Sequence, residues 1–275
     1  MIDSFAPDLM EGRTVFVSGG GSGVNLAIAR AVADLGGDVS ICGRTGGRLE
    51  QAAEHLRSRG ARVVTTVADV RDGQAVAEAF ARTEAELGPV DGVVCGAAGN
   101  FVAPAERIST NGFKAVVDID LLGSFHVARE AFDHLRRTKG SVVFVSGGQS
   151  VTPLADQAHV AAAKAGVDQL MRSMALEWAP HGIRVNSIIP GPVEGTEGMR
   201  RLTEGAMGQV WVDSVPLGRF AEGAEIGAMA AVLLSDIASY MTGTQLLVDG
   251  GLNLSGGGHI TASSGRLAAT GGTRA

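Results

Sequence analysis

An apolar run that enters a glycine-rich loop and leaves it as a helical pattern constrains this chain more than any other feature. Residues 15–17 are apolar, residues 18–23 read Ser-Gly-Gly-Gly-Ser-Gly, and apolar residues recur at helical spacing over 26–35. Glycine lets a backbone approach a ligand closely, and the amides and positive dipole at a helix start stabilise negative charge. We therefore predict a strand, a pyrophosphate-binding loop and a helix, with contacts from Ser18, Gly19, Gly21, Ser22, Gly23 and Asn25.

A second apolar run, residues 39–42, ends in Gly43, Arg44 and Thr45, near where such a fold meets an adenosine ribose. A site for NAD carries an acidic residue there, which accepts the 2′-hydroxyl. The guanidinium of Arg44 instead suits a 2′-phosphate, although many arginines are only solvated surface residues. The position of Arg44 therefore favours NADP(H) as the cofactor.

Strand-like runs alternate with helical patterns through the rest of the chain. The strand-like runs cover residues 62–68, 90–95, 141–146, 184–189 and 245–248, and the helical patterns cover 72–87, 110–135, 158–178 and 224–234. This alternation is typical of a parallel sheet with helices on both faces, and right-handed crossovers then make it doubly wound. We predict an α/β fold, a single-domain Rossmann-type doubly wound parallel sheet of about seven strands.

The ends of the chain and one internal stretch fall outside this pattern. Residues 1–12 are an N-terminal extension, residues 13–254 form the Rossmann-fold domain, and residues 255–275 are a Gly/Ser-rich C-terminal tail. Residues 190–215 are rich in Gly, Glu and Thr, so we predict a substrate lid there.

Composition argues against several classes of protein. The chain has 275 residues, of which 45% are hydrophobic and 19% charged, as in an ordinary soluble domain. Its net charge is −6 and it has no dense run of Lys or Arg, so we expect no nucleic-acid or membrane partner. It begins without a basic and apolar leader, so we expect a cytoplasmic protein. The two cysteines and six histidines lack metal-ligand spacing.

Several segments together resemble the short-chain dehydrogenase/reductase family. The resemblance rests on the glycine loop at 18–23, Asp69-Val70, Ala97-Ala98-Gly99, and the segments 163–166, 184–191 and 248–251. Two motifs, the glycine loop and the segment before Ala97, depart from the pattern of the family. Asn25 replaces the last glycine of the loop, and Cys95 and Gly96 stand where the family has asparagines. The resemblance implies a nicotinamide cofactor and a homodimer or homotetramer.

The catalytic positions of that family are also altered. The family tyrosine, four residues before the lysine, falls on Val160, and the family serine falls on Gly147, next to Ser146. The family asparagine falls on Asp120, and only Lys164 is retained. Ketone reduction with a proton from tyrosine therefore does not suit this chain.

One branch of the family lacks this tyrosine, and the chain resembles it. The peroxisomal-type 2,4-dienoyl-CoA reductases are similar at residues 97–101, 104–109, 118–120, 157–159 and 191–202. The resemblance implies NADPH-dependent reduction of a trans-2,4-dienoyl-CoA to a 3-enoyl-CoA, with Asp120 and Lys164 as the central pair. The α-carbon is then protonated by water, so the site must stabilise charge on the thioester oxygen and hold that water.

The remaining candidates complete the predicted site. The catalytic candidates are Lys164, Asp120, Ser146 and His159, where His159 is equally readable as a structural histidine. Lys164 also binds cofactor, as do Arg44, Asp69, Val70, Ala97, Ala98, Gly99, Pro190, Gly191 and Val193. The substrate-binding candidates are Asn100, Phe101, Arg107, Ser150, Thr196, Arg200 and Arg201, whose arginines suit the phosphates of an acyl-CoA.

Two alternatives remain open at this point. The chain could be an NADP(H)-dependent oxidoreductase that acts on another carbonyl or conjugated substrate, because fold and cofactor do not fix the substrate. It could also be a non-catalytic NADPH-binding protein, since three family catalytic residues are replaced.

Overall fold

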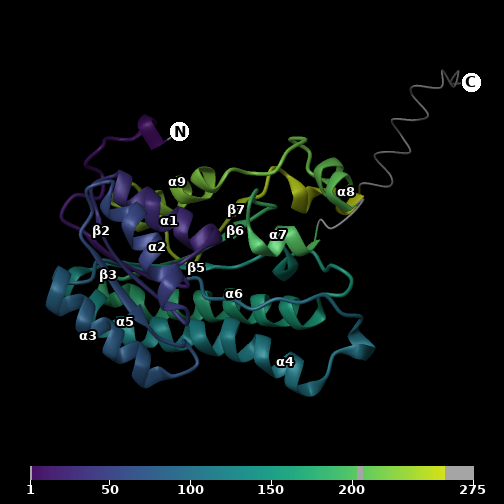
Figure 1. Cartoon of the computed structure of the whole chain (residues 1–275), viewed down its shortest axis with the longest axis horizontal. Helices are drawn as coiled ribbons and strands as arrows, with labels where there is room; N and C mark the ends of the chain where they lie inside the picture. The colour runs from purple at the N-terminus through teal and green to yellow at the C-terminus, as the bar shows by residue number, and fades with distance from the viewer. Residues whose placement is uncertain (1, 203–206, 258–275) are drawn as a thin grey trace, which may run out of the picture.

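Seven parallel strands form one sheet in the order β3-β2-β1-β4-β5-β6-β7 in the computed structural model, which describes residues 2–202 and 207–257 (Figure 1). The strands are β1 Thr14–Ser18, β2 Asp38–Gly43, β3 Val63–Val67, β4 Gly92–Cys95, β5 Ser141–Val145, β6 Arg184–Pro190 and β7 Gln245–Val248. The chain winds outward from β1 to β3 and, after a crossover, from β4 to β7. The predicted doubly wound sheet is confirmed.

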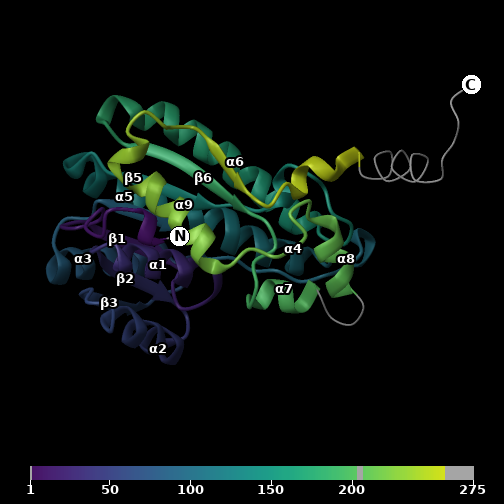
Figure 2. The same ribbon diagram turned by 90° about the horizontal axis from the view of Figure 1, so that it is seen from above.

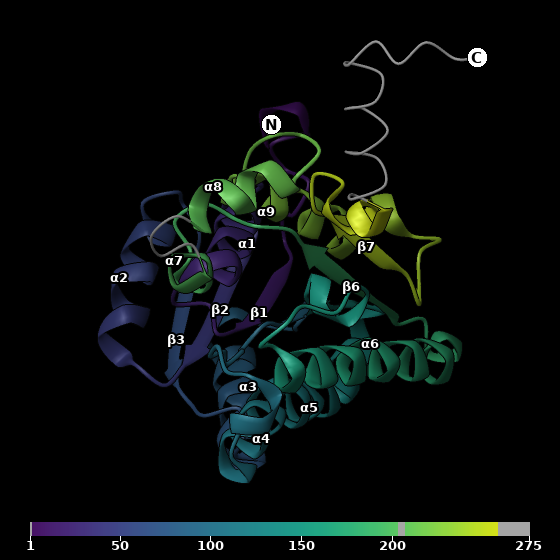
Figure 3. The ribbon, with the colours of Figure 1, turned by 90° about the vertical axis from the view of Figure 1, so that its right-hand side faces the viewer.

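Helices cover both faces of the sheet (Figure 3). One face carries α1 Gly23–Asp34, α2 Gly46–Arg57 and α9 Gly223–Leu234, and the other carries α3 Gly73–Leu87, α5 Gly123–Thr138 and α6 Ala158–Trp178. The central strands are buried because helices pack on both sides of them. Val15 and Val17 of β1 belong to one core, and Phe16 belongs to the other.

Shorter helical elements fill the connections. They are α4 Thr110–Val117, α7 Glu197–Leu202 and α8 Met207–Ser214, and the short 3-10 helices η1 Ile2–Ser4, η2 Ala105–Arg107, η4 Gly148–Ser150, η5 Ala179–His181, η6 Asp236–Ala238 and η7 Leu252–Gly257. Helices α4, α7 and α8 lie at the end of the molecule toward which the strands point (Figure 2). No helix of the described residues is long and apolar enough to span a membrane.

The predicted helix over residues 110–135 is only partly right. It begins at Thr110 as expected, but a π-helical turn, η3 Asp118–Leu122, separates α4 from α5. The Oγ of Ser124 donates to the carbonyl of Asp120, within this turn, at 2.6 Å. The turn places Asp120 with no exposed surface.

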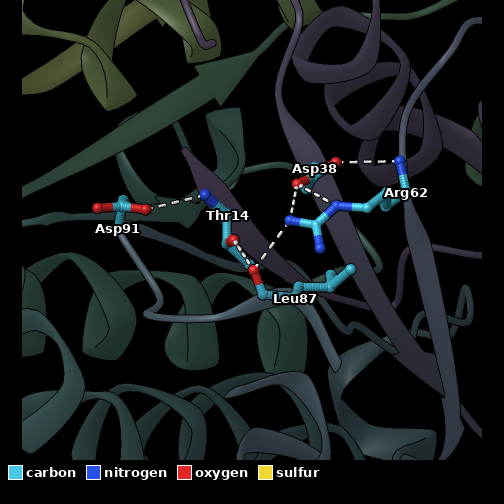
Figure 4. A network of polar contacts seen from close by, with 5 residues as sticks. All are labelled: Thr14, Asp38, Arg62, Leu87 and Asp91. Atoms are coloured by element: carbon cyan, nitrogen blue, oxygen red, sulfur yellow. Dashed lines mark hydrogen bonds and ion pairs between the residues drawn. The ribbon is translucent and has the colours of Figure 1, made fainter. Parts of the chain in front are cut away.

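A polar network joins residues at the amino ends of four neighbouring strands, or just before those ends (Figure 4). The carboxylate of Asp91 accepts from the Thr14 amide at 2.9 Å, and the carbonyl of Leu87 accepts from Arg62 at 3.1 Å. Arg62 also donates to Asp38 at 2.9 Å. These contacts lie at the edge opposite the carboxyl ends, so they brace the sheet and leave the other edge available for ligands.

The predicted lid and tail are only partly described. Residues 190–215 contain α7 and α8, while residues 203–206 lie outside the described residues. Of the predicted tail, only residues 255–257 fall within the described part, at the end of η7.

Candidate active site

One cleft of about 890 Å³ opens at the carboxyl ends of the strands. It lies where the connections from β1 and β4 run in opposite directions, the usual ligand position in an open α/β sheet. Many residues predicted to bind cofactor or substrate line it together: Gly19, Gly21, Ser22, Gly23, Asn25, Arg44, Asp69, Val70, Ala97, Ala98, Gly99, Asn100, Asp120, Ser146, Lys164, Pro190 and Thr196.

The glycine loop has the geometry of a phosphate-binding turn. Gly19 and Gly23 have φ of +70° and +59°, a left-handed conformation that favours glycine. Ser22 is the N-cap residue of α1 but makes no side-chain capping hydrogen bond. The first amides of α1 are thus uncapped by a side chain, and they suit an anionic group.

Arginines lie at the far end of the cleft from Lys164. Arg44 follows β2, and Arg48 lies in the first turn of α2; both line the cleft. Nearby, Asp69 accepts from the guanidinium of Arg71 at 2.6 Å, which lowers the pKa of the Asp69 carboxyl. Two guanidinium groups and an ionised carboxylate therefore face the space where an adenosine would lie.

A buried ion pair occupies the other end of the cleft. The Nζ of Lys164 lies 3.2 Å from Oδ2 of Asp120 and donates to the carbonyl of Val145 at 3.1 Å. Oδ1 of Asp120 accepts from the amide of Gly99 at 2.7 Å. The side chains of Lys164 and Asp120 are only 10% and 0% exposed, so each stabilises the charge of the other away from bulk water.

An apolar surface replaces the tyrosine expected beside this lysine. Val160 lies one helical turn before Lys164, is 4% exposed and lines the cleft. It packs in a small cluster with Val116 and Ala163, against which Phe101 also packs. Ser146, at the end of β5, also lines the cleft, and its buried Oγ has no hydrogen-bond partner among the described residues.

Several predicted catalytic and substrate residues do not line the cleft. His159 is fully buried, and its ring packs against that of Phe101 at a tilt of 32° with centroids 4.0 Å apart. Burial lowers the pKa of the His159 imidazole. In the part of the chain that the structure covers, neither ring nitrogen of His159 has a hydrogen-bond partner. Ser150 also lies outside the lining, in η4. His159 therefore packs against Phe101 away from the lining, while Lys164 and Asp120 both line the cleft.

Three residues predicted to bind cofactor support the site from behind. Ser18 Oγ donates to the carbonyl of Val94 at 3.1 Å and accepts from the Gly96 amide at 3.0 Å. Gly191 packs so closely on Asp249 that a Cβ would lie 2.6 Å from its Cα. Val193 belongs to the hydrophobic core. None of the three residues lines the cleft itself.

The predicted CoA-binding arginines lie outside the lining of the cleft. Arg107 is exposed in η2, and Arg200 in α7 pairs with Glu197 at 2.8 Å. Arg201 belongs to α7, but its side chain lies outside the described part of the structure. Thr196, at the start of this segment, reaches the cleft and donates to the carbonyl of Val193 at 2.9 Å.

Sequence reasoning missed some lining residues. Arg48, Gln149, Ile119 and Glu197 all line the cleft. Arg48 could have been found, because it lies one helical turn after Arg44 in a helix that starts at the same strand end. Gln149 had no comparable signal, because the path of the loop after β5 decides where it points.

The fold and the site together define an oxidoreductase of the short-chain dehydrogenase/reductase class. The sequence model of the family described as Enoyl-(Acyl carrier protein) reductase matches residues 19–253, and the chain belongs to this family of short-chain oxidoreductases. A gluconate 5-dehydrogenase of Burkholderia cenocepacia J2315, solved in complex with NADP and tartrate, has a similar structure. Its TM-score is 0.85 at 29% identity, covering 90% of this chain and 98% of that one.

Relatives of similar length are more alike in sequence. The chain is 40% identical over 253 residues to the (3E)-enoyl-CoA-producing peroxisomal 2,4-dienoyl-CoA reductase of Saccharomyces cerevisiae, covering 90% of this chain and 87% of that protein. It is 38% identical over 247 residues to a Bacillus subtilis protein named "Probable 2,4-dienoyl-CoA reductase", (2E)-enoyl-CoA-producing, covering 88% and 97%. The stated resemblance to the dienoyl-CoA reductases is confirmed at the level of sequence similarity.

Proposed function

We propose that this protein is an NADPH-dependent reductase of 2,4-dienoyl-CoA thioesters. The observation that carries the proposal is the buried Lys164–Asp120 pair beside Val160, where a proton-donating tyrosine would otherwise lie. A reaction that suits such a site ends in protonation of carbon by water rather than protonation of an alkoxide by tyrosine. The similarity to named dienoyl-CoA reductases supports this substrate class.

The cleft fits a nicotinamide dinucleotide with a 2′-phosphate. Gly19 and Gly23 leave room for a pyrophosphate at the uncapped start of α1, and Arg44 and Arg48 suit the extra phosphate. When bound, NADPH supplies a hydride. Lys164 holds three N–H donors, of which one reaches Val145 and another faces Asp120, so one is left for a ribose hydroxyl or a water.

The chain's own groups would handle the charge that develops on the substrate. Hydride addition at C5 of a 2,4-dienoyl thioester places negative charge on the thioester oxygen. The buried Oγ of Ser146, which has no partner within the described residues, is a hydroxyl in the cleft that could donate to such an oxygen. Val160 and the cluster around it offer the acyl chain an apolar wall.

The final proton would come from a water bound beside the Lys164–Asp120 pair, whose two charged groups are in direct contact at 3.2 Å. Protonation at C2 gives a 3-enoyl-CoA, and protonation at C4 gives a 2-enoyl-CoA. Asp120 is fixed by Gly99 at 2.7 Å, and Lys164 is fixed by Val145, so the pair can hold a water in one place. The position of that water decides which product forms.

The test is NADPH oxidation with trans-2,4-hexadienoyl-CoA, beside the free acid, a 3-ketoacyl-CoA and NADH. We expect turnover of the dienoyl thioester, with deuterium from D₂O at C2 or C4 of the product. If NADPH binds but only the 3-ketoacyl-CoA reacts, the protein is instead a short-chain oxidoreductase of another carbonyl.

The roles of Asp120 and Lys164 have their own prediction. Asp120→Asn and Lys164→Met should each lower kcat by about a hundredfold or more, because each removes half of the group that holds the water. Asp118→Asn is the matched control, since Asp118 lies in the same turn but pairs with the exposed Lys114. A pH–rate profile that neither Asp120→Asn nor Lys164→Met alters would contradict the proposed proton source.

A further inference from the structure

Asn25 joins two segments that are far apart in the sequence. It lies in the first turn of α1, and its Nδ2 donates to the carbonyl of Gly96 at 2.7 Å and to that of Gly19 at 3.4 Å. Gly19 begins the phosphate loop, and Gly96 begins the segment after β4. A single amide group thus ties the two walls of the cleft together.

Only glycine fits at position 96, directly beneath the side-chain amide of Asn25. A Cβ on Gly96 would lie 2.5 Å from Cγ of Asn25 and closer still to its Oδ1. The backbone of Gly96 does not have a positive φ, and the three atoms nearest to such a Cβ all belong to Asn25, so a smaller residue at position 25 would remove these clashes. The need for glycine at 96 therefore comes from the side chain at 25.

The amide must present its nitrogen to the two carbonyl oxygens, because a carbonyl only accepts hydrogen bonds. Oδ1 is then turned away from them, and it has no hydrogen-bond partner among the residues that the structure covers. A carboxylate at position 25 would fill the same volume but would face both carbonyls with negative oxygen. Shape and donor capacity can therefore be separated by mutation.

The segment that Asn25 holds leads to the reaction end of the cleft. Its start is also fixed by Ser18, which accepts from the Gly96 amide at 3.0 Å, and its end is fixed where the Gly99 amide donates to Asp120 at 2.7 Å. Ala97, Ala98 and Gly99 line the cleft between these anchors. Any shift at Gly96 is passed along this short segment to the Asp120–Lys164 pair.

We propose that Asn25 and Gly96 are a matched pair that positions the cofactor-binding segment after β4. The family pattern has a glycine at position 25 and an asparagine after β4, and this chain has the reverse arrangement. The inference rests on the cofactor half of the proposed function and is independent of the substrate.

The experiment measures NADPH and NADH dissociation constants by fluorescence titration, without acyl-CoA, for Asn25→Gly, Asn25→Asp, Gly96→Ala and the double variant Asn25→Gly/Gly96→Ala. We expect Asn25→Asp to weaken binding of both cofactors at least tenfold and to be worse than Asn25→Gly. The single variant Gly96→Ala should show no measurable cofactor binding. The double variant Asn25→Gly/Gly96→Ala should bind again, with dissociation constants within about threefold of those of the single variant Asn25→Gly. Asn111→Asp, an exposed position in α4, is the control.

Either of two results would overturn the proposal that Asn25 and Gly96 are a matched pair. If Asn25→Asp binds NADPH like the unmodified protein, the amide only fills space. If Gly96→Ala has the same effect with and without Asn25, the two positions are independent. Thermal melting of each variant without cofactor separates a loss of folding from a loss of binding, and Asn25→Gly remains informative if Gly96→Ala does not fold. Because no acyl-CoA is present, failure of the dienoyl-CoA proposal leaves both outcomes readable.

Discussion

Arg44 and Arg48 give the cleft its positive end, and their removal tests cofactor choice. Charge-assisted hydrogen bonds to a phosphate contribute about 1.5–3 kcal/mol, so Arg44→Ala or Arg48→Ala should raise the KM for NADPH about 10- to 100-fold. The KM for NADH should stay within about threefold, because NADH lacks the 2′-phosphate. Steady-state kinetics with each cofactor measures the change in the two KM values.

The control for this prediction lies on the same helix. Arg57 is near the end of α2, pairs with Glu50 at 3.6 Å and does not line the cleft. Arg57→Ala should leave both KM values unchanged. Equal losses for NADPH and NADH in the Arg44 and Arg48 variants would show that these arginines do not recognise the phosphate.

Residues of the cleft could be predicted where the evidence lay in the neighbouring sequence. Arg44 and the glycine loop were placed in the cleft from strand ends and residue type alone. The position of His159 outside the lining of the cleft was not foreseen, because it depends on the direction in which the helix turns its side chain. His159 lies five residues before Lys164, about 140° away around the helix, and so faces Phe101 instead of the cleft.

Helices and strands were predicted better than their interruptions. The helix Ala158–Trp178 and the strand Gln245–Val248 have the bounds that hydrophobic periodicity gave them. The π-helical turn at Asp118–Leu122 was missed, because it depends on contacts from other elements, such as the Gly99 amide on Asp120. Periodicity reports which face is buried and is insensitive to one widened turn.

The start of α9 carries a pH-dependent contribution to stability. Glu225 accepts two bonds from Arg219 at 2.7 Å and one from the Glu222 amide at 2.8 Å, which lowers the pKa of Glu225 to about 2. Because the folded-state pKa is below the ordinary value of 4.5, this stabilisation is present above pH 4.5 and is lost as the pH falls toward 2.

Glu225→Gln should therefore lower the free energy of unfolding at pH 7 by about 1 kcal/mol, since the partner Arg219 is half exposed and solvent screens the pair. The difference should shrink as the pH approaches 2, as measured by urea denaturation across this range. Glu86→Gln, which breaks an exposed pair with Arg82 in α3, should cost less at pH 7. A Glu225→Gln difference that stays constant with pH would argue against the ion pair.

For the whole molecule, alternation of strands and helices was enough to predict the topology. Right-handed crossovers leave few ways to order seven parallel strands, and the observed order is the doubly wound one. The cleft follows from that order, because it forms where the winding reverses. The cytoplasmic location and the number of subunits stay predictions, because a single chain's sheet topology fixes neither.

The number of subunits can be tested on the surface of α4, η3 and α5. Phe113, Leu122 and Phe125 are 41%, 40% and 38% exposed there, which is unfavourable for large apolar side chains in water. We expect these helices to contact a second copy, so that light scattering after size exclusion gives a dimer or a tetramer.

Phe125→Glu should weaken that assembly by about a hundredfold or more, because it would bury a charge without a partner. Val67→Glu, on the outer strand β3, should keep the original mass, and a wild-type monomer at micromolar concentration would contradict the expectation.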